Sequence, residues 1–260
     1  EGNDIKIAWG RPAVMDVDLD GVTDLLFGSY VPHGSVGEGV QLYKNTAVSS
    51  SNPFTYEKQS SWPLSSACTS GWCWAATGHF NDDNILDLMI NNKMFKHNSD
   101  GTFTDQTDEW GNGLYHLTND RKFRDNGLGK FEFHSQITFG DVDLDGDDDA
   151  IIGTNIGTLE YYERTELSPP KWIKQDASDE WSLANVNVGG DAKPTLMDYD
   201  NDGDLDLIVG NGDGVFFLFE QGTCASSCTT SGSCNLASEY MPSCICAFEG
   251  STSGRSCNSW

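Results

Sequence analysis

Hydrophobic and polar positions along the chain form a pattern that recurs four times. Each unit opens with a short apolar segment, such as "PAVMD" or "PTLMD", followed by a polar loop and a second apolar run. A turn with glycine and an alternating segment come next, as in "GVQLYKN" and "GVFFLFEQG". Short apolar or alternating runs between turn signals are typical of β-strands. The pattern therefore predicts units of strand, loop, strand, hairpin, strand and strand.

The polar loop is the part of the unit that recurs most clearly. Its copies start at positions 16, 79, 141 and 198, so the unit is about 60 residues long. With the strands that follow, they read "DVDLDGVTDLLFG", "HFNDDNILDLMIN", "DVDLDGDDDAIIG" and "DYDNDGDLDLIVG". Four-stranded antiparallel sheets at a regular period predict an all-β fold, a four-bladed β-propeller over residues 1–222. A β-sandwich with acidic loops is the alternative.

The fourth unit lacks a last strand before the cysteine-rich end begins at residue 223. The N-terminal stretch "DIKIAWGRPAVMD" resembles "NVNVGGDAKPTLMD", which leads into the fourth unit. Residues Asp4–Trp9 are therefore expected to complete the fourth blade and to close the ring. Pairing with a blade of a neighbouring molecule is the alternative.

The charge of the chain narrows the classes of partner. Its 260 residues include 40 acidic and 15 basic ones, which gives a formal net charge of -25. Such a chain repels nucleic acid and anionic lipid, whose phosphates are bound by Lys and Arg. Its apolar runs are shorter than the roughly 18 to 20 residues that span a bilayer, so we expect no membrane insertion. The start "EGNDIKIAWG" is not typical of a signal peptide, and we expect a mature product or an excised segment.

Three of the acidic loops, 16–24, 141–149 and 198–206, have the side chains of a calcium-binding turn. Aspartates occupy positions 1, 3 and 5, and glycine at position 6 permits a sharp turn. An EF-hand would need Glu at position 12, where this chain has Phe27, Ile152 or Val209. The last carboxylate instead stands at position 9, at the start of the next strand.

The spacing D-x-D-x-D-G-x-x-D between two apolar strands, with "TFGD" before one copy and "NSDGTFTD" after another, resembles the FG-GAP/VCBS repeats of integrin α-subunit propellers. The resemblance covers roughly residues 1–222 and implies about three Ca²⁺ ions. It implies side-chain ligation by Asp16, Asp18, Asp20 and Asp24, by Asp141, Asp143, Asp145 and Asp149, and by Asp198, Asp200, Asp202 and Asp206. It further implies ligation by the backbone carbonyls of Val22, Asp147 and Asp204.

The loop 79–87 departs from this pattern. His79 replaces the first aspartate, Asn81 the second, and Asn84 the glycine. Imidazole is a poor ligand for a hard cation. A fourth ion is therefore left open, with Asn81, Asp83 and Asp87 as the weaker candidate ligands.

Eight cysteines predict disulfides and hence a secreted, extracellular or cell-surface protein. Cys68 and Cys73 are expected to close a small loop before the second blade, and two free thiols are the alternative. Residues 223–260 hold the other six, and the spacing of Cys244 and Cys246, with Phe248 and Gly250 after them, resembles an EGF-like module. A zinc cluster is the alternative. The resemblance implies the pairs Cys224–Cys234, Cys228–Cys244 and Cys246–Cys257, with Ser233 as a candidate O-glycosylation site.

No catalytic motif such as HExxH, GxSxG or a P-loop occurs, so the expected function is not enzymatic. The composition and the resemblance together predict a secreted calcium-binding module for adhesion or structural interaction, with an extracellular protein or a glycan as its partner. Self-assembly into a homo-oligomer or a fibre is a further expectation. The alternatives are a lectin, with Trp72 and Trp74 as stacking faces for sugar, and a polysaccharide lyase.

Overall fold

The described residues form an all-β structure with four larger antiparallel sheets, which confirms the prediction of an all-β fold with four repeated sheets. The chain divides into two compact units, Glu1–Arg121 with Glu166–Lys171, and Lys122–Thr165 with Trp172–Trp260. No helix in the described part is long and apolar enough to cross a membrane. The computed structural model describes residues 11–31, 39–47, 55–68, 71–91, 93–110, 136–167, 169–175, 183, 186–219, 221, 244–248 and 255–259.

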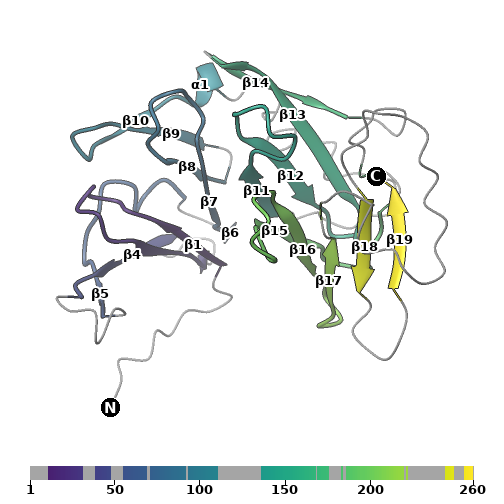
Figure 1. The fold of residues 1–260 in the computed structure, drawn as a ribbon. Helices are drawn as coiled ribbons and strands as arrows, with labels where there is room; N and C mark the ends of the chain where they lie inside the picture. The colour runs from purple at the N-terminus through teal and green to yellow at the C-terminus, as the bar shows by residue number, and fades with distance from the viewer. Residues whose placement is uncertain are drawn as a thin grey trace. The chain divides into compact units, whose positions relative to one another are not determined.

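The first unit contains two four-stranded sheets in which each strand pairs with its neighbours along the repeat (Figure 1). A two-stranded sheet pairs β3 with β6, and a short helix, α1, follows the second sheet. The first sheet consists of β1 (Arg11–Met15), β2 (Asp24–Gly28), β4 (Val40–Asn45) and β5 (Tyr56–Lys58). The second consists of β7 (Ala75–Gly78), β8 (Asp87–Ile90), β9 (Lys93–His97) and β10 (Phe103–Asp105). The remaining elements are β3 (Tyr30–Val31), β6 (Gly71–Trp72) and α1 (Thr107–Trp110).

The two sheets of this unit pack side by side around one core. Strand β1 lies against β7, and the Thr77 hydroxyl donates a hydrogen bond to the Val14 carbonyl at 3.3 Å. Apolar side chains from both sheets are buried together, among them Leu26, Leu88 and Ile90. Burial of such side chains is the main stabilising contribution to a fold of this kind.

The second unit contains the fourth sheet and most of the third, whose segment Glu166–Lys171 is assigned to the first unit. Strand β11 lies against β15, and Ile151, Leu159 and Leu207 share one buried core. The third sheet consists of β11 (Gln136–Gly140), β12 (Asp149–Gly153), β13 (Leu159–Leu167) and β14 (Pro170–Lys174). The fourth consists of β15 (Lys193–Met197), β16 (Asp206–Gly210), β17 (Phe216–Phe219), β18 (Cys244–Phe248) and β19 (Arg255–Ser259).

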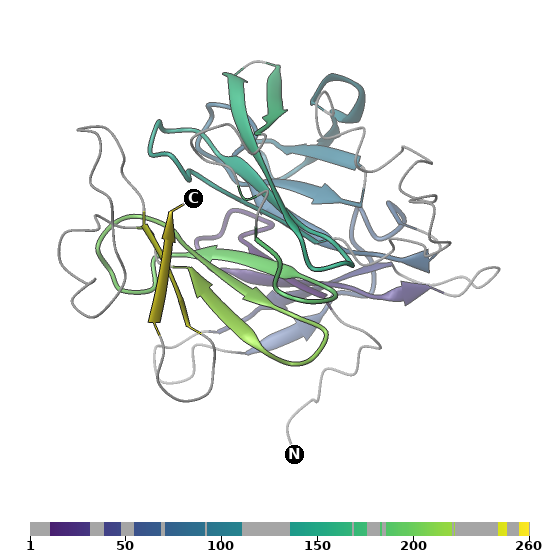
Figure 2. The same ribbon diagram turned by 90° about the vertical axis from the view of Figure 1, so that its right-hand side faces the viewer.

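The fourth sheet differs from the sequence-based prediction. The strand next to β17 is β18, with Phe219 opposite Ala247, and β19 follows it (Figure 2). The prediction that Asp4–Trp9 takes this place is therefore wrong, although that segment itself lies outside the described residues. The register of β18 and β19 sets Cys246 directly opposite Cys257.

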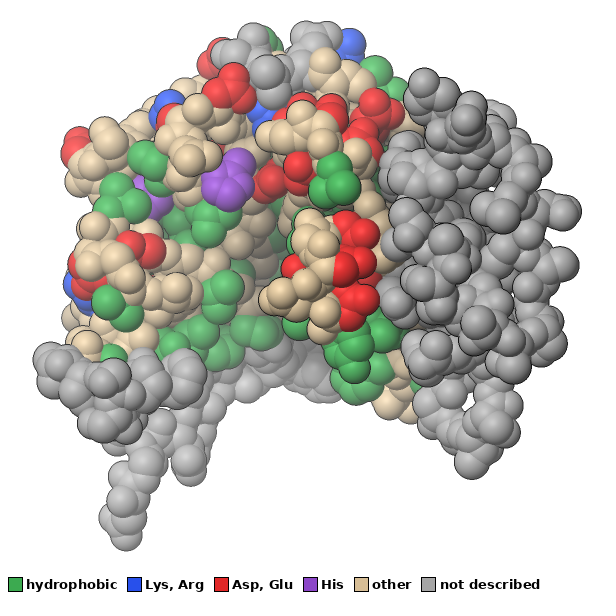
Figure 3. Space-filling view, viewed as in Figure 1, with side chains coloured by type: hydrophobic (Ala, Val, Ile, Leu, Met, Phe, Trp, Pro, Cys, Tyr) green, Lys and Arg blue, Asp and Glu red, His purple; other side chains and the backbone are tan. Residues whose placement is uncertain are grey.

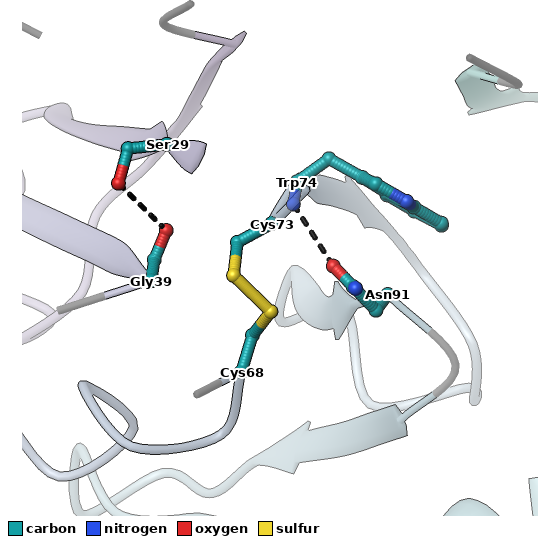
Figure 4. The surroundings of a disulfide bond; sticks show 6 residues. All are labelled: Ser29, Gly39, Cys68, Cys73, Trp74 and Asn91. Carbon is teal, nitrogen blue, oxygen red and sulfur yellow. Dashed lines mark hydrogen bonds between the residues drawn. A yellow bond between two sulfur atoms is a disulfide. The ribbon is translucent and has the colours of Figure 1, made fainter. Parts of the chain in front are cut away.

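One disulfide, between Cys68 and Cys73, belongs to the first unit (Figure 4). It lies beside β4, where Gly39 leaves no room for a side chain: a Cβ there would stand 2.1 Å from the Cys68 carbonyl oxygen. Next to it, the backbone N–H of Trp74 donates to Oδ1 of Asn91 at 2.9 Å. The bond thus fixes the chain that leads into the second sheet. Trp74 itself is half-buried, and the side chain of Trp72 lies outside the described residues.

Candidate metal-binding loops

Each acidic loop joins the first and second strands of its sheet at the same register. We call them loop 1 (16–24), loop 2 (79–87), loop 3 (141–149) and loop 4 (198–206), and number their positions 1 to 9. The aspartate at position 9 is the first residue of the second strand in every sheet. It faces the last residue of the first strand in the pairs Met15↔Asp24, Gly78↔Asp87, Gly140↔Asp149 and Met197↔Asp206.

The backbone of three loops bends in the same way. Loops 1, 3 and 4 have positive φ at position 6, where Gly21, Gly146 and Gly203 stand at 86°, 99° and 102°. They also have positive φ at position 4, with values between 58° and 64° at Leu19, Leu144 and Asn201. Among the described residues of loop 2, only Asn84 at position 6 has positive φ. Loop 2 therefore takes a different path at its tip.

The carboxylate at position 1 fixes this shape in the three similar loops. It accepts the glycine N–H of position 6, at 2.7 Å from Gly21 to Asp16, 3.1 Å from Gly146 to Asp141 and 3.2 Å from Gly203 to Asp198. Loop 2 has His79 at this position in place of the aspartate. The first aspartate is thus both a backbone cap and a candidate ligand.

Carboxylate oxygens gather in three of the four loops. Three residues in each of them offer oxygens that all lie within 4.8 Å of one another, so each group could hold a metal ion. Like charges at such distances repel, and a cation among them would relieve the repulsion. The groups are Asp16, Asp18 and Asp24 in loop 1, Asp141, Asp143 and Asp145 in loop 3, and Asp198, Asp200 and Asp206 in loop 4.

The predicted ligands outside these groups have other contacts in the described structure. Asp20 lies 3.4 Å from the Lys44 ammonium and accepts the N–H of Val22 at 2.9 Å. Asp202 accepts the N–H of Asp204 at 3.2 Å. Asp149 is held by hydrogen bonds of its own. The structure thus brings together only part of each predicted set.

Burial, and after it the charge of neighbouring carboxylates, raises the pKa of several carboxyl groups in loops 3 and 4. Burial, and then the charge of Asp145, raise the pKa of Asp143 to about 6. Burial also raises the pKa of Asp147 to about 6, against the opposing charge of Arg164. Burial and Asp202 raise the pKa of Asp204 to about 7. Acidic side chains gather in patches on the face seen in Figure 3.

Some of these oxygens are buried without a hydrogen-bond partner. They are one oxygen each of Asp141 and Asp147 in loop 3 and of Asp204 in loop 4. A buried polar atom without a partner costs free energy, and native structures rarely leave one so. A donor set made only of oxygens suits a hard cation such as Ca²⁺ or Mg²⁺. The residues present therefore fit a bound divalent ion.

The aspartate at position 9 has a structural task in the first sheet and in the second. Asp24 is 1 % exposed, and its two oxygens accept the N–H groups of Val17 at 3.1 Å and Asn45 at 2.8 Å. Asp87 is fully buried and accepts from Phe80 at 3.1 Å and His97 at 2.8 Å. One donor belongs to position 2 of the loop, and the other to the end of the third strand.

The third and fourth sheets repeat this arrangement. Asp149 accepts from Val142 at 3.3 Å and from Arg164 at 2.8 Å, and the Tyr161 hydroxyl adds a bond of 2.8 Å. Burial raises the pKa of Asp149 to about 7, although these bonds oppose the shift. Asp206 accepts from Tyr199 and Gln221, both at 2.8 Å. Position 9 therefore ties the loop to the third strand in all four repeats.

The sequence does not reveal the donors that reach position 9 from the third strand or from just after it. Asn45, His97, Arg164 and Gln221 act through their backbone N–H groups, which every residue type except proline carries. Their distance along the chain from position 9 varies, because the hairpins differ in length. The only signal in the sequence for the position of these donors is the end of each alternating segment, such as "GVQLYKN" and "GVFFLFEQG".

Two of these residues also reach the preceding loop through their side chains. Nε2 of His97 lies 3.1 Å from the Val17 carbonyl in loop 1. Nε2 of Gln221 donates to the Val142 carbonyl in loop 3 at 2.9 Å. Both side chains are buried. Within each unit, the second sheet is thus bonded to the acidic loop of the first.

These features define a class: an all-β repeat protein whose blade-like sheets each carry a loop between the first and second strands, with clustered carboxylates in three of them. No model of a known protein family matches the chain, and no curated protein gives a significant match.

Proposed function

We propose that the chain is a calcium-stabilised four-bladed β-propeller that serves as a non-enzymatic module for adhesion or structural interaction outside the cell. The observation that carries the proposal is the recurrence of three carboxylates, with oxygens within 4.8 Å, at one place in three repeats. A single acidic cluster is common on protein surfaces, whereas three at equivalent positions indicate a shared task.

Calcium is the ion that best suits these loops. It accepts six to eight oxygen ligands in flexible geometry, which carboxylates and carbonyls of a tight turn supply. The residues that would hold it are those of the three groups, with the carbonyls at position 7 as the resemblance implies. When bound, the ion would neutralise the carboxylates and fix the turn between two strands. The FG-GAP/VCBS resemblance supports calcium over magnesium, which demands stricter octahedral geometry.

The cysteine-rich end fits a disulfide-stabilised appendage of this propeller. Cys246 stands opposite Cys257 in the pairing of β18 with β19, as one of the three EGF-like disulfides would require. We propose that this bond forms and that it holds β18, which pairs with β17, to β19 at the edge of the fourth sheet. A small appendage with little core depends on such bonds. Because disulfides form and persist in oxidising compartments, we propose an extracellular location for the chain.

Removal of calcium tests the proposal. Extracellular modules bind calcium with Kd of about 10⁻⁴ to 10⁻³ M, so 10 mM calcium would stabilise the folded chain by about 1.4 to 2.7 kcal/mol per site. We expect the melting temperature to fall on addition of excess EGTA and to recover when calcium is restored. Magnesium at the same concentration is the control and should restore less.

A melting temperature that is the same in calcium and in EGTA would overturn the proposal. Equilibrium dialysis against ⁴⁵Ca²⁺ gives the second readout, with about three ions bound per chain as the expected value. Asp16→Ala, Asp141→Ala and Asp198→Ala should each remove one ion, because each takes away a position 1 carboxylate.

A further inference from the structure

One side chain beside each loop changes its charge from repeat to repeat. It belongs to the residue just before the third-strand N–H that bonds to position 9. This residue is Lys44 beside loop 1, Lys96 beside loop 2 and Glu163 beside loop 3. Residue 220, the equivalent beside loop 4, is also Glu in the sequence and lies outside the described residues. The first unit thus presents a cation to its loops where the third repeat presents an anion.

In loop 1 this cation reaches the candidate ligands themselves. The Lys44 ammonium forms a salt bridge with Asp18 and lies 3.4 Å from Asp20. These carboxylates stand at positions 3 and 5, where the resemblance implies calcium ligation. The lysine side chain already offsets part of the charge that would attract a divalent ion.

Loop 2 has an amide hydrogen bond and an ion pair where the other loops crowd carboxylates together. The Asn81 amide at position 3 donates to Oδ2 of Asp87 at position 9, at 2.8 Å. The Lys96 ammonium lies 3.0 Å from Asp83 at position 5. An amide hydrogen bond and a lysine therefore join and neutralise the positions that crowd together in the other loops.

Beside loop 3 the neighbouring side chain is negative, and the sequence has glutamate at the equivalent position beside loop 4. Glu163 stands close enough for its charge to act on Asp143. Partnerless buried oxygens occur at Asp141, Asp147 and Asp204, whereas the described part of loops 1 and 2 has none. Two of these atoms belong to position 7, where loops 3 and 4 have aspartate and loops 1 and 2 have Val22 and Ile85. The charge of the neighbouring residue and the residue type at position 7 thus separate the loops in the same way.

We propose that the side chains of Lys44, Asn81 and Lys96 grade the calcium requirement of the four loops. Loop 2 is stable without an ion, loop 1 binds calcium most weakly because calcium must displace Lys44, and loops 3 and 4 bind it most tightly. The inference rests on the proposed calcium function and adds to it which repeats depend on the ion. The second unit is then the calcium-dependent part of the chain, and the first unit is largely self-sufficient.

Calcium titration of the full chain in decalcified buffer, by isothermal titration calorimetry, tests this grading. We expect three ions, one of them bound more weakly than the other two. Lys44→Gln removes the competing charge and should tighten the weakest site roughly three- to tenfold, since charge contacts near the surface have modest effects. Lys174→Gln is the matched control, because it breaks an exposed Lys–Glu pair with Glu160 at 2.5 Å outside the acidic loops. It should leave all three affinities within twofold.

A gain of function tests loop 2. The triple variant His79→Asp, Asn81→Asp and Lys96→Gln restores the missing carboxylates and removes the lysine, and it should bind a fourth ion. Its far-UV circular dichroism and melting curve confirm that it folds. A folded triple variant that still binds three ions would overturn the assignment for loop 2, as would four ions bound to the unmodified chain.

The remaining outcomes separate this inference from the proposed function. If no loop binds calcium, the proposed function fails and the grading fails with it. If three ions bind with equal affinity and Lys44→Gln changes none of them, the grading fails while the proposed function stands. If Lys44→Gln tightens one site alone and Asp16→Asn abolishes that same site, the grading is supported.

Discussion

Loop 2 and loop 4 start and end at the same register of their sheets, and both place a fully buried aspartate at position 9. In both, that aspartate accepts the N–H of position 2 and an N–H from the end of the third strand. Above this shared base they differ. Loop 4 gathers three carboxylates, whereas loop 2 joins Asn81 to Asp87 by a hydrogen bond. The frame of the turn is therefore separable from its candidate metal site.

The difference shows that the aspartate at position 9 has one structural task in every repeat, whether or not it is also a candidate metal ligand. Its backbone contacts recur in all four repeats, whether or not the other ligand positions are acidic. The carboxylates at positions 1, 3 and 5 vary, and with them the capacity to hold a cation. Loop 2, which lacks aspartate at positions 1 and 3, thus keeps the same frame through the aspartate at position 9.

The largest expected effect comes from removal of the aspartate at position 9, which both loops share. Asp87→Ala leaves two buried N–H groups without an acceptor, each at a cost of about 1 to 3 kcal/mol, so the free energy of unfolding should fall by about 2 to 6 kcal/mol. Asp206→Ala should lose a similar amount without calcium and more with it, because it also removes a candidate ligand. Urea denaturation in 10 mM calcium and in EGTA measures both.

The exposed carboxylate of Asp213 provides the control, and Asp213→Ala should change stability by no more than about 0.5 kcal/mol. If Asp87→Ala lowers the free energy of unfolding no more than this control does, the structural role assigned to position 9 is wrong. The comparison also breaks if the loss in Asp87→Ala depends on calcium as strongly as the loss in Asp206→Ala.

The pH dependence of stability should distinguish the metal-free from the calcium-bound chain. The raised pKa values of Asp143 and Asp147, about 6, and of Asp204, about 7, mean that the folded chain holds protons that the unfolded chain has released. In decalcified buffer, the free energy of unfolding should therefore fall as pH rises from about 4 to about 7. With calcium the trend should weaken or reverse, since the ion competes with protons for the same oxygens.

Urea titrations at pH 5 and pH 8, with and without calcium, measure this. The double variant Asp147→Asn, Asp204→Asn should flatten the metal-free profile, because it removes two of the groups that titrate. Stability that rises with pH in decalcified buffer would contradict the expected sign.

The smallest expected effect concerns the tip of the turn. Gly146 has a φ of 99° and open space around the place of a Cβ, so that Gly146→Ala meets backbone strain and no clash. A side chain in left-handed backbone costs about 1 to 2 kcal/mol. Asn84→Gly in loop 2 should change stability by about 0.5 kcal/mol or less, because asparagine tolerates this conformation. If Gly146→Ala does not change the free energy of unfolding, the positive φ at position 6 imposes no strain on loop 3, and the expected difference between the tips of loop 3 and loop 2 is wrong.

The sequence by itself determined the local structure. Four copies of an apolar segment, an acidic loop and two further strands predicted all-β sheets with loops at 16–24, 79–87, 141–149 and 198–206, because the alternation of side chains and the glycine at position 6 act over a few residues. It also predicted that the loop with His79 and Asn81 would differ from the others.

Only the tertiary structure decided how distant residues share the loops. Asp87 meets the backbone of His97, Lys44 meets Asp18, and β18 takes the edge of β17 that the sequence assigned to Asp4–Trp9. The residue type does not reveal which backbone N–H groups donate to position 9, because every residue except proline has one. A lysine on a strand looks like any surface residue in the sequence, and only the hairpin places it beside the loop. Such contacts depend on hairpin length and sheet register, which arise from the packing of the whole unit.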